Sequence, residues 1–298
     1  MNYRKLPKTN LRISEISFGC MSLDLTRDDN EHLLRTATER GINYFDTADL
    51  YDRGANEELV GSALKPVRDQ VIIATKVGNQ WLPDGSGWQW NPTKQYILEA
   101  VDQSLKRLQT DYIDIYQLHG GTIDDDRQEV MEAFEQLKQQ GKIRYYGISS
   151  IRPNVIDAYK QTGIVSNMLQ YSLLDRRPEE EVLDILQQHE VGVMVRGGLA
   201  KGLLGGKPAK DYLEHSTAAV SSLQNGLNEI KNERSLTQTA LKYVLSNSAV
   251  TTAVVGIRTM EQLIDAVKTS DAPDLSMEEL DRLKNILPAQ RYQQHRIQ

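Results

Sequence analysis

The sequence predicts an α/β fold, a closed (β/α)8 TIM barrel, and three observations lead to this prediction. Short runs of apolar and β-branched residues recur eight times along the 298 residues. The segments between them carry apolar residues three or four positions apart, the period of an amphipathic helix. Eight alternating units in about 300 residues favour a single barrel domain, residues 1–298. A doubly wound open sheet is the alternative, but the first run is followed by Gly19–Cys20–Met21–Ser22, which is not the GxGxxG turn typical of that fold.

The predicted strands are apolar without strict alternation, which is typical of parallel strands covered on both faces. They lie at residues 13–18, 42–45, 71–75, 112–118, 143–148, 168–173, 191–195 and 252–255. Helices are predicted at residues 29–39, 96–108, 129–139, 179–188, 237–245 and 259–267, and Pro153 and Pro178 each stand where a first helical turn begins. Residues 80–92, with three tryptophans, and residues 202–228 are expected to be long loops.

Composition limits the classes of function. The net charge of −6 argues against a general nucleic-acid binder, which requires a basic face. One cysteine, Cys20, allows no intramolecular disulfide and favours a reducing compartment. The first residues carry no apolar segment of a secretory signal, and no run of 18 apolar residues could span a membrane. The expected location is therefore the cytoplasm, with no membrane partner.

Four chemically capable side chains converge on one rim of the predicted barrel. The second, third and fourth strands end at Asp46, Lys76 and His119, and Tyr51 follows Asp46 by five residues. Active sites of such barrels lie at this end of the strands. A free tyrosine, with a pKa near ~10, is a weak acid at neutral pH, but a neighbouring ammonium lowers that pKa. Lys76 can act in this way, Asp46 can hold Lys76, and His119 can orient a carbonyl oxygen; a cofactor must supply the hydride.

These segments resemble the aldo-keto reductase family nearly from end to end. The most specific are FDTADLYD, with Asp46 and Tyr51, IIATKV, with Lys76, and SLKRLQTDYIDIYQLH, which ends at His119. The opening YRKLPKTNLRISEISFG resembles the family's N-terminal β-hairpin, which closes the barrel bottom. The resemblance implies an NADPH-dependent reductase of small aldehydes or ketones. Tyr51 would be the acid in reduction and the base in alcohol oxidation.

The resemblance also implies a cofactor site, and no metal site. Ser149 and Gln170 match positions that bind the nicotinamide amide, although Ser150 stands where asparagine is usual and Met168 where the glutamine often aligns. Arg196 takes the place of an aromatic ring that often stacks on the nicotinamide, or it pairs with a nearby carboxylate. Arg258 suits a 2′-phosphate at a helix N-terminus. The predicted cofactor-binding residues are Met21, Asp46, Ser149, Gln170, Arg196, Gly197, Leu199, Lys201, Gly256, Arg258 and Gln262.

Two other functions stay open at this stage. An NADPH-binding sensor or regulatory subunit would bind the nucleotide with little turnover. A lyase or isomerase would use Lys76 as a Schiff base and need no nucleotide. Trp81, Trp88 and Trp90 either form an apolar wall for the substrate or pack within their own loop. The substrate and the oligomeric state are not predicted.

Overall fold

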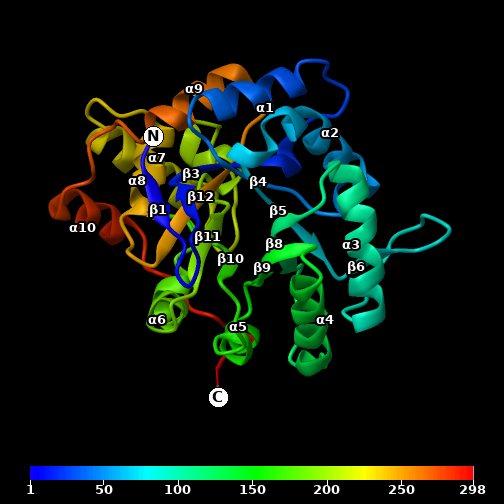
Figure 1. Cartoon of the computed structure of the whole chain (residues 1–298). Coiled ribbons are helices and arrows are strands. Elements are labelled where there is room, and N and C mark those ends of the chain that lie inside the picture. The colour runs from blue at the N-terminus through cyan, green and yellow to red at the C-terminus, as the bar shows by residue number, and fades with distance from the viewer. Residues whose placement is uncertain (298) are drawn as a thin grey trace.

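Eight parallel strands form a closed barrel in the computed structural model, which describes residues 1–297 (Figure 1). The strands are β3 (Ile16–Gly19), β4 (Tyr44–Asp46), β5 (Ile72–Val77), β8 (Ile113–Leu118), β9 (Ile143–Ser149), β10 (Ser166–Gln170), β11 (Gly192–Arg196) and β12 (Val250–Gly256). Around the barrel they follow the order β10-β11-β12-β3-β4-β5-β8-β9. The predicted (β/α)8 barrel is thus confirmed.

Helices surround this barrel on its outside (Figure 1). They are α1 (Asn30–Glu39), α2 (Ala55–Leu64), α3 (Lys94–Leu108), α4 (Arg127–Gln139), α5 (Pro153–Tyr159), α6 (Val182–Gln188), α7 (Thr217–Ile230), α8 (Leu236–Leu245), α9 (Met260–Lys268) and α10 (Met277–Ile286). The six predicted helices correspond to α1, α3, α4, α6, α8 and α9. The helix predicted at residues 179–188 starts later than expected, because a separate 3-10 helix occupies Arg177–Glu180. No helix of the described residues has both the length and the apolar character needed to cross a membrane.

The long loop predicted at residues 202–228 is wrong, because most of its second half is helix α7. Ser216 caps this helix by accepting a hydrogen bond from the Ala219 N–H. Val220, Leu223 and Leu227 are buried at spacings of three and four residues. Helices α2 and α10 were also not predicted. The helix was missed because Ser221, Ser222, Gln224 and Asn225 stand between its buried positions, so the stretch reads as polar.

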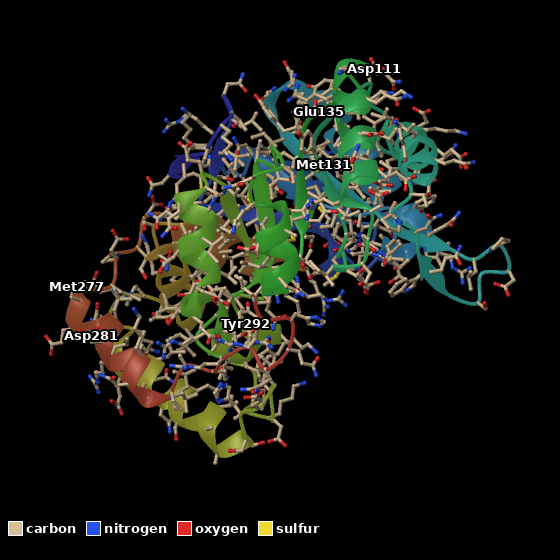
Figure 2. The ribbon with its side chains drawn as sticks, turned by 90° about the horizontal axis from the view of Figure 1, so that it is seen from below. Asp111, Met131, Glu135, Met277, Asp281 and Tyr292 are labelled. Atoms are coloured by element: carbon tan, nitrogen blue, oxygen red, sulfur yellow. The ribbon has the colours of Figure 1, made fainter. Side chains whose placement is uncertain are left out.

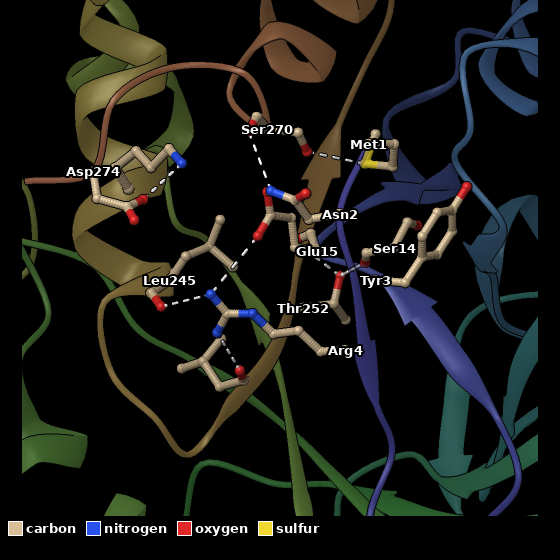
Figure 3. A network of polar contacts seen from close by, with 12 residues as sticks. Met1, Asn2, Tyr3, Arg4, Ser14, Glu15, Leu245, Thr252, Ser270 and Asp274 are labelled. Carbon is tan, nitrogen blue, oxygen red and sulfur yellow. Dashed lines mark hydrogen bonds and ion pairs between the residues drawn. The ribbon is translucent and has the colours of Figure 1, made fainter.

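The first predicted strand, residues 13–18, is two elements. Glu15 separates β3 from β2 (Arg12–Ser14), which pairs antiparallel with β1 (Tyr3–Lys5). The Arg4 guanidinium donates hydrogen bonds to the carbonyls of Val250, at 2.8 Å, and Leu245, at 2.9 Å, and so ties the hairpin to β12 and α8 (Figure 3). The expected N-terminal hairpin is therefore present.

The hairpin closes the N-terminal end of the barrel. Leu6 and Ile13 are fully buried and belong to the same apolar cluster as the interior residues Ile72 and Met194. The polar side chains around it bind neighbouring segments of the chain. Asn2 donates to Glu15 and to the Ser270 carbonyl, 3.0 and 3.2 Å away (Figure 3). The hairpin thus covers the end of the barrel opposite to the strand ends that carry the predicted site residues.

Residues 80–92 form a hairpin rather than an irregular loop. β6 (Asn79–Trp81) pairs antiparallel with β7 (Trp88–Trp90). The Trp90 indole N–H donates to Asp125 at 2.9 Å, and the Arg53 guanidinium lies 5.1 Å from the centre of the Trp81 ring. Trp81 is thus held against the segment that carries Tyr51, while Trp88 is half exposed.

The C-terminal segment returns to the barrel after α10. Tyr292 is buried, and its ring centre lies 5.5 Å from the Arg177 guanidinium carbon. Figure 2 shows Met277 and Asp281 of α10 at the edge of the molecule and Tyr292 nearer its centre. Arg177 follows β10, so the segment braces the loop after that strand.

Alternation along the strands determines which residues reach the barrel mouth. Tyr44, Ala74, Ile115, Met168, Met194 and Val254 all belong to the interior cluster. Two residues further along each strand, the next inward positions are Asp46, Lys76, Gln117, Gln170, Arg196 and Gly256. The strand alternation therefore brings the predicted site residues from five of the strands to one ring at the C-terminal end.

Candidate active site

The structure brings Asp46, Tyr51, Lys76 and His119 together. The Lys76 ammonium Nζ lies 2.6 Å from Asp46 Oδ1 and 3.4 Å from the Tyr51 hydroxyl. Tyr51 opens the 3-10 helix η2 (Tyr51–Gly54), and its ring meets that of His119 edge to face at 5.7 Å between centroids. Below, these four residues are called the quartet.

Lys76 is fully buried and uses its three N–H donors on three acceptors. The third acceptor is the Thr47 carbonyl oxygen, at 2.6 Å. Burial lowers the pKa of Lys76, but Asp46 and then Tyr51 raise it by more, so the pKa lies above its ordinary value. Gln117 donates to the second carboxylate oxygen of Asp46 at 3.4 Å. The ammonium is therefore held charged and in one position.

Burial raises the pKa of Tyr51 above its ordinary value, and Lys76 offsets only part of this rise. The lowered pKa of Tyr51 expected from the sequence is wrong. Packing around the phenol excludes water, and this raises the pKa by more than the charge of the neighbouring lysine lowers it. Lys76 donates its hydrogen bond to the phenol oxygen. The Tyr51 proton is consequently free to point to a different acceptor.

His119 is neutral at physiological pH. Burial, followed by the charges of Lys76 and Arg196, lowers its pKa to about 3. Among residues 1–297, no side-chain or backbone group pairs with its buried Nδ1 atom. A neutral imidazole has one N–H donor, so His119 can donate a hydrogen bond without competing for the proton of Tyr51.

The predicted nicotinamide side contains Ser149, Gln170 and Arg196. Ser149 ends β9 and is half buried. Gln170 uses both ends of its amide: its nitrogen donates to Asp175 at 2.8 Å, and its oxygen accepts from Arg196 at 2.9 Å. Asp175 is itself paired with Arg177. Arg196 thus contacts an amide oxygen, and within residues 1–297 it makes no pair with a carboxylate of the kind considered from the sequence.

The predicted pyrophosphate loop contains Gly197, Leu199 and Lys201. Gly197 has a φ of 72°, and a Cβ there would lie 3.1 Å from Gln170 Cγ. Lys201 is exposed and also left-handed, with a φ of 58°, between Ala200 at 46° and Gly202 at 91°. Leu199 is partly buried against the core. This unusual backbone turns the loop sharply at the barrel mouth.

Gly256, Arg258 and Gln262 gather around the first turn of α9. The Arg258 backbone N–H donates to the Gln262 side chain at 2.9 Å, and Arg258 Nε donates to the Ser22 carbonyl at 2.9 Å. Ser22 closes the 3-10 helix η1 (Cys20–Ser22), in which Met21 is 64% exposed. A Cβ on Gly256 would lie 2.1 Å from Ser22 Oγ. Two segments far apart in sequence therefore meet here.

Sequence reasoning missed several residues of this region. Gln117 had a usable signal, because it precedes His119 by two residues and so shares its inward face. Asp49 lies within FDTADLYD but was not singled out, although its carboxyl group is buried and neither oxygen accepts a hydrogen bond. Asp175 and the Thr47 carbonyl depend on loop conformation, for which the sequence carries no comparable pattern.

Comparison with known proteins agrees with this geometry. The family model described as "Aldo/keto reductase family" matches residues 15–288. The chain belongs to the aldo-keto reductase family. The family uses nicotinamide cofactors and reduces carbonyl groups.

The chain is similar to a curated relative and to solved structures along its full length. An "uncharacterized oxidoreductase YqkF" of Bacillus subtilis is 47% identical, with 99% of this chain and 100% of the relative covered. The holo form of the aldo-keto reductase AKR11C1 from Bacillus halodurans is 47% identical, with both chains fully covered and a TM-score of 0.95. The apo form of AKR11C1, 46% identical and also fully covered, has a TM-score of 0.86.

Proposed function

We propose that this protein reduces aldehydes or ketones to alcohols with NADPH, and that Tyr51 is the general acid. The observation that carries this proposal is the direction of one hydrogen bond: Lys76 donates to the Tyr51 oxygen. Because the phenol accepts there, its own proton can be given to a substrate oxygen. The neutral ring of His119 packs edge to face against the Tyr51 ring.

Each member of the quartet has a distinct part in this reaction. Bound nicotinamide supplies the hydride for the carbonyl carbon. Tyr51 gives its proton to the carbonyl oxygen as negative charge develops there, and the adjacent Lys76 ammonium stabilises the resulting phenolate. Asp46 keeps Lys76 charged, and His119 donates a hydrogen bond that orients the carbonyl. In alcohol oxidation the Tyr51 phenolate would take the proton back.

The residues around the mouth fit such a cofactor. Exposed Arg258 is anchored through Nε, which leaves its terminal nitrogens for an anion. The better superposition on the holo than on the apo form of AKR11C1 also supports a nucleotide site. The residues that would hold NADPH are Met21, Asp46, Ser149, Gln170, Arg196, Gly197, Leu199, Lys201, Gly256, Arg258 and Gln262.

A Schiff-base lyase fits this site poorly. A Schiff base requires a free amine as the nucleophile. The Lys76 pKa is raised, and all three donors of its ammonium are engaged. The surroundings of Lys76 therefore favour electrostatic support of Tyr51 over covalent chemistry.

Tyr51→Phe tests the acid. The wild-type protein should consume NADPH when small aldehydes are added, and the variant should lose at least about 100-fold in kcat, because it lacks the proton. Its NADPH affinity, measured by fluorescence, should stay within about twofold. Tyr145→Phe is the matched control, since the Tyr145 hydroxyl contacts Asn10 at the closed end of the barrel. Near-normal turnover by Tyr51→Phe would refute the assignment, and tight NADPH binding without wild-type turnover would favour a sensor.

Arg258→Ala tests the choice of nucleotide. The variant should bind NADPH roughly tenfold or more weakly, because a charge-assisted contact to the 2′-phosphate is lost. The affinity for NADH should change little, since NADH lacks that phosphate. Equal losses for the two nucleotides would contradict the assignment of Arg258.

A further inference from the structure

Trp90 lies against the ends of two strands that carry quartet residues. It ends β7, in the hairpin that projects from the barrel between β5 and α3 (Figure 1). A Cβ on Gly78 would lie 2.6 Å from Trp90 Cζ3, and a Cβ on Gly120 would lie 3.5 Å from the same atom. Gly78 follows Lys76 by two residues, and Gly120 follows His119 directly. The indole therefore covers the backbone where the chain leaves β5 and β8.

The Trp90 indole is held from two sides. Its Nε1–H donates a hydrogen bond to Asp125 Oδ1 at 2.9 Å. Asp125 is fixed in turn, because its carboxylate accepts from the N–H and the hydroxyl group of Thr122, at 2.6 and 2.8 Å. On the other side, the Asn91 N–H donates to the Gly78 carbonyl at 2.7 Å. Trp90 is consequently fixed between its own hairpin and the loop that follows β8.

His119 depends on packing of this kind for its position. Among the described residues no polar group pairs with its buried Nδ1 atom, so the hydrogen bond that commonly fixes one nitrogen of a histidine ring is missing there. The backbone N–H of His119 donates to the Val77 carbonyl at 2.7 Å, its carbonyl accepts from Asn79 at 3.1 Å, and its ring meets that of Tyr51. Gly120 has a φ of 135°, where glycine moves freely, so the segment gains rigidity from what packs on it.

We propose that Trp90 is a positioning residue of the reductase, which holds the backbone at Gly120 so that the His119 N–H meets the carbonyl oxygen of the substrate. Asp125 fixes Trp90 in this role. The proposal rests on the proposed reductase function and adds these two residues to its support. Trp90 acts through His119 and transfers no proton itself. Its loss should therefore affect the orientation of the carbonyl and leave nucleotide binding unchanged.

The test is a double-mutant cycle between Trp90 and His119. Trp90→Leu removes the indole and should lower kcat/KM for a small aldehyde about 10- to 100-fold, because a small displacement of a catalytic group is costly. In the His119→Ala background the same substitution should lower kcat/KM by less than about threefold, since no imidazole is left to displace. A merely structural role would give equal losses in both backgrounds.

Three further variants sharpen the test. Trp90→Phe keeps a ring over Gly120 and should lose clearly less activity than Trp90→Leu. Asp125→Ala removes the acceptor of the indole N–H and should lower kcat/KM about 3- to 10-fold, again only where His119 is present, so it decides the question if Trp90→Leu does not fold. Trp88→Leu is the matched control: Trp88 is 52% exposed on the same strand, and its loss should leave kcat/KM within about twofold.

Circular dichroism shows whether each variant is folded, and NADPH fluorescence should give an affinity within about twofold of wild type. Equal losses in the two backgrounds, or an unchanged kcat/KM in Trp90→Leu, would overturn the positioning role. A large loss of NADPH affinity in a folded Trp90→Leu protein would make Trp90 a nucleotide contact and would overturn it too. If the wild-type protein reduces no aldehyde with NADPH, the reductase function itself is refuted, and the role of Trp90 with it.

Discussion

Asp49 gives a quantitative prediction about stability. Its side chain is only 8% exposed, and neither carboxyl oxygen accepts a hydrogen bond within the described chain. Burial, and then the nearby Glu57 carboxylate, raises the pKa of Asp49 to about 8, although Arg107 and Lys76 act in the opposite direction. Asp49 is therefore protonated in the folded protein at neutral pH and ionised in the unfolded chain.

The size of the effect follows from the two pKa values. One pKa unit corresponds to about 1.4 kcal/mol, and the unfolded value is close to 3.8. Protonated Asp49 makes its full contribution to the free energy of unfolding at pH values below the pKa of the unfolded chain. This contribution is lost as the pH rises to about 8, the pKa in the folded protein. Relative to its value at low pH, the free energy of unfolding at pH 7 is thus lower by about 4 kcal/mol. About 3 kcal/mol of this decrease falls between pH 5 and pH 7.

Asp49→Asn removes this dependence, because an amide does not ionise. Its buried N–H and C=O groups cost about 1–3 kcal/mol if they stay unpaired, so the variant should be more stable than wild type by about 1–3 kcal/mol at pH 7. The decisive quantity is the difference between variant and wild type, which should grow by about 3 kcal/mol from pH 5 to pH 7.

Urea unfolding at pH 5, 6 and 7 measures this difference directly. Asp52→Asn is the matched control, because Asp52 is exposed three residues away and the same substitution there should change stability by less than about 0.5 kcal/mol. Parallel pH profiles for wild type and Asp49→Asn would refute the reasoning, since they would mean that Asp49 ionises alike in the folded and unfolded states.

Three further substitutions address the site and its support. Lys76→Met should lower the free energy of unfolding by about 3–5 kcal/mol, because it leaves the Asp46 carboxylate buried without a partner. Adding Asp46→Asn should restore much of the lost stability. If the second substitution restores none, the ion-pair explanation is contradicted. Gly61→Ala should destabilise by about 1–3 kcal/mol in urea, since a Cβ would lie 2.6 Å from the backbone of α3, whereas Ser62→Ala on the exposed side of α2 should have a smaller effect. His119→Gln should lower kcat but keep the shape of the pH profile of kcat/KM between pH 5 and 8, because the pKa of His119 is about 3. If the wild-type profile has an inflection in that range and the variant loses it, this pKa is contradicted.

The site residues at the strand ends could be predicted because the two-residue alternation of side chains determines which way they point. A parallel strand alternates its side chains, and the apolar runs place Asp46 and Lys76 one step beyond buried residues of the same face. His119 follows β8 directly, so its position was also close to determined. The predicted boundaries were wrong where one run contains parts of two strands. Ile13 and Ile16 lie on either side of Ser14 and Glu15, and the pattern alone does not show that the chain changes its pairing partner there.

The electrostatics of the site could not be predicted in the same way. A sequence shows that Lys76 and Tyr51 can be neighbours, but desolvation of the phenol depends on segments that pack around it from elsewhere. The contacts of Gln170 depend on the loop after β10, where the strand predicted at residues 168–173 in fact stops at Gln170. Residues past the strand ends follow loop geometry, and no regular period describes them.

The site residues fall into two groups, those positioned by the strands of the barrel and those positioned by loops. The quartet stands largely on strand ends, whose geometry the barrel itself fixes, so a reductase could be expected from the pattern of strands and ionisable residues. The orientation of Arg196 depends on Asp175 and Arg177, which lie in a loop braced by Tyr292 from the C-terminal segment. The barrel therefore fixes the positions of the quartet, while loop contacts fix the positions of Gln170 and Arg196.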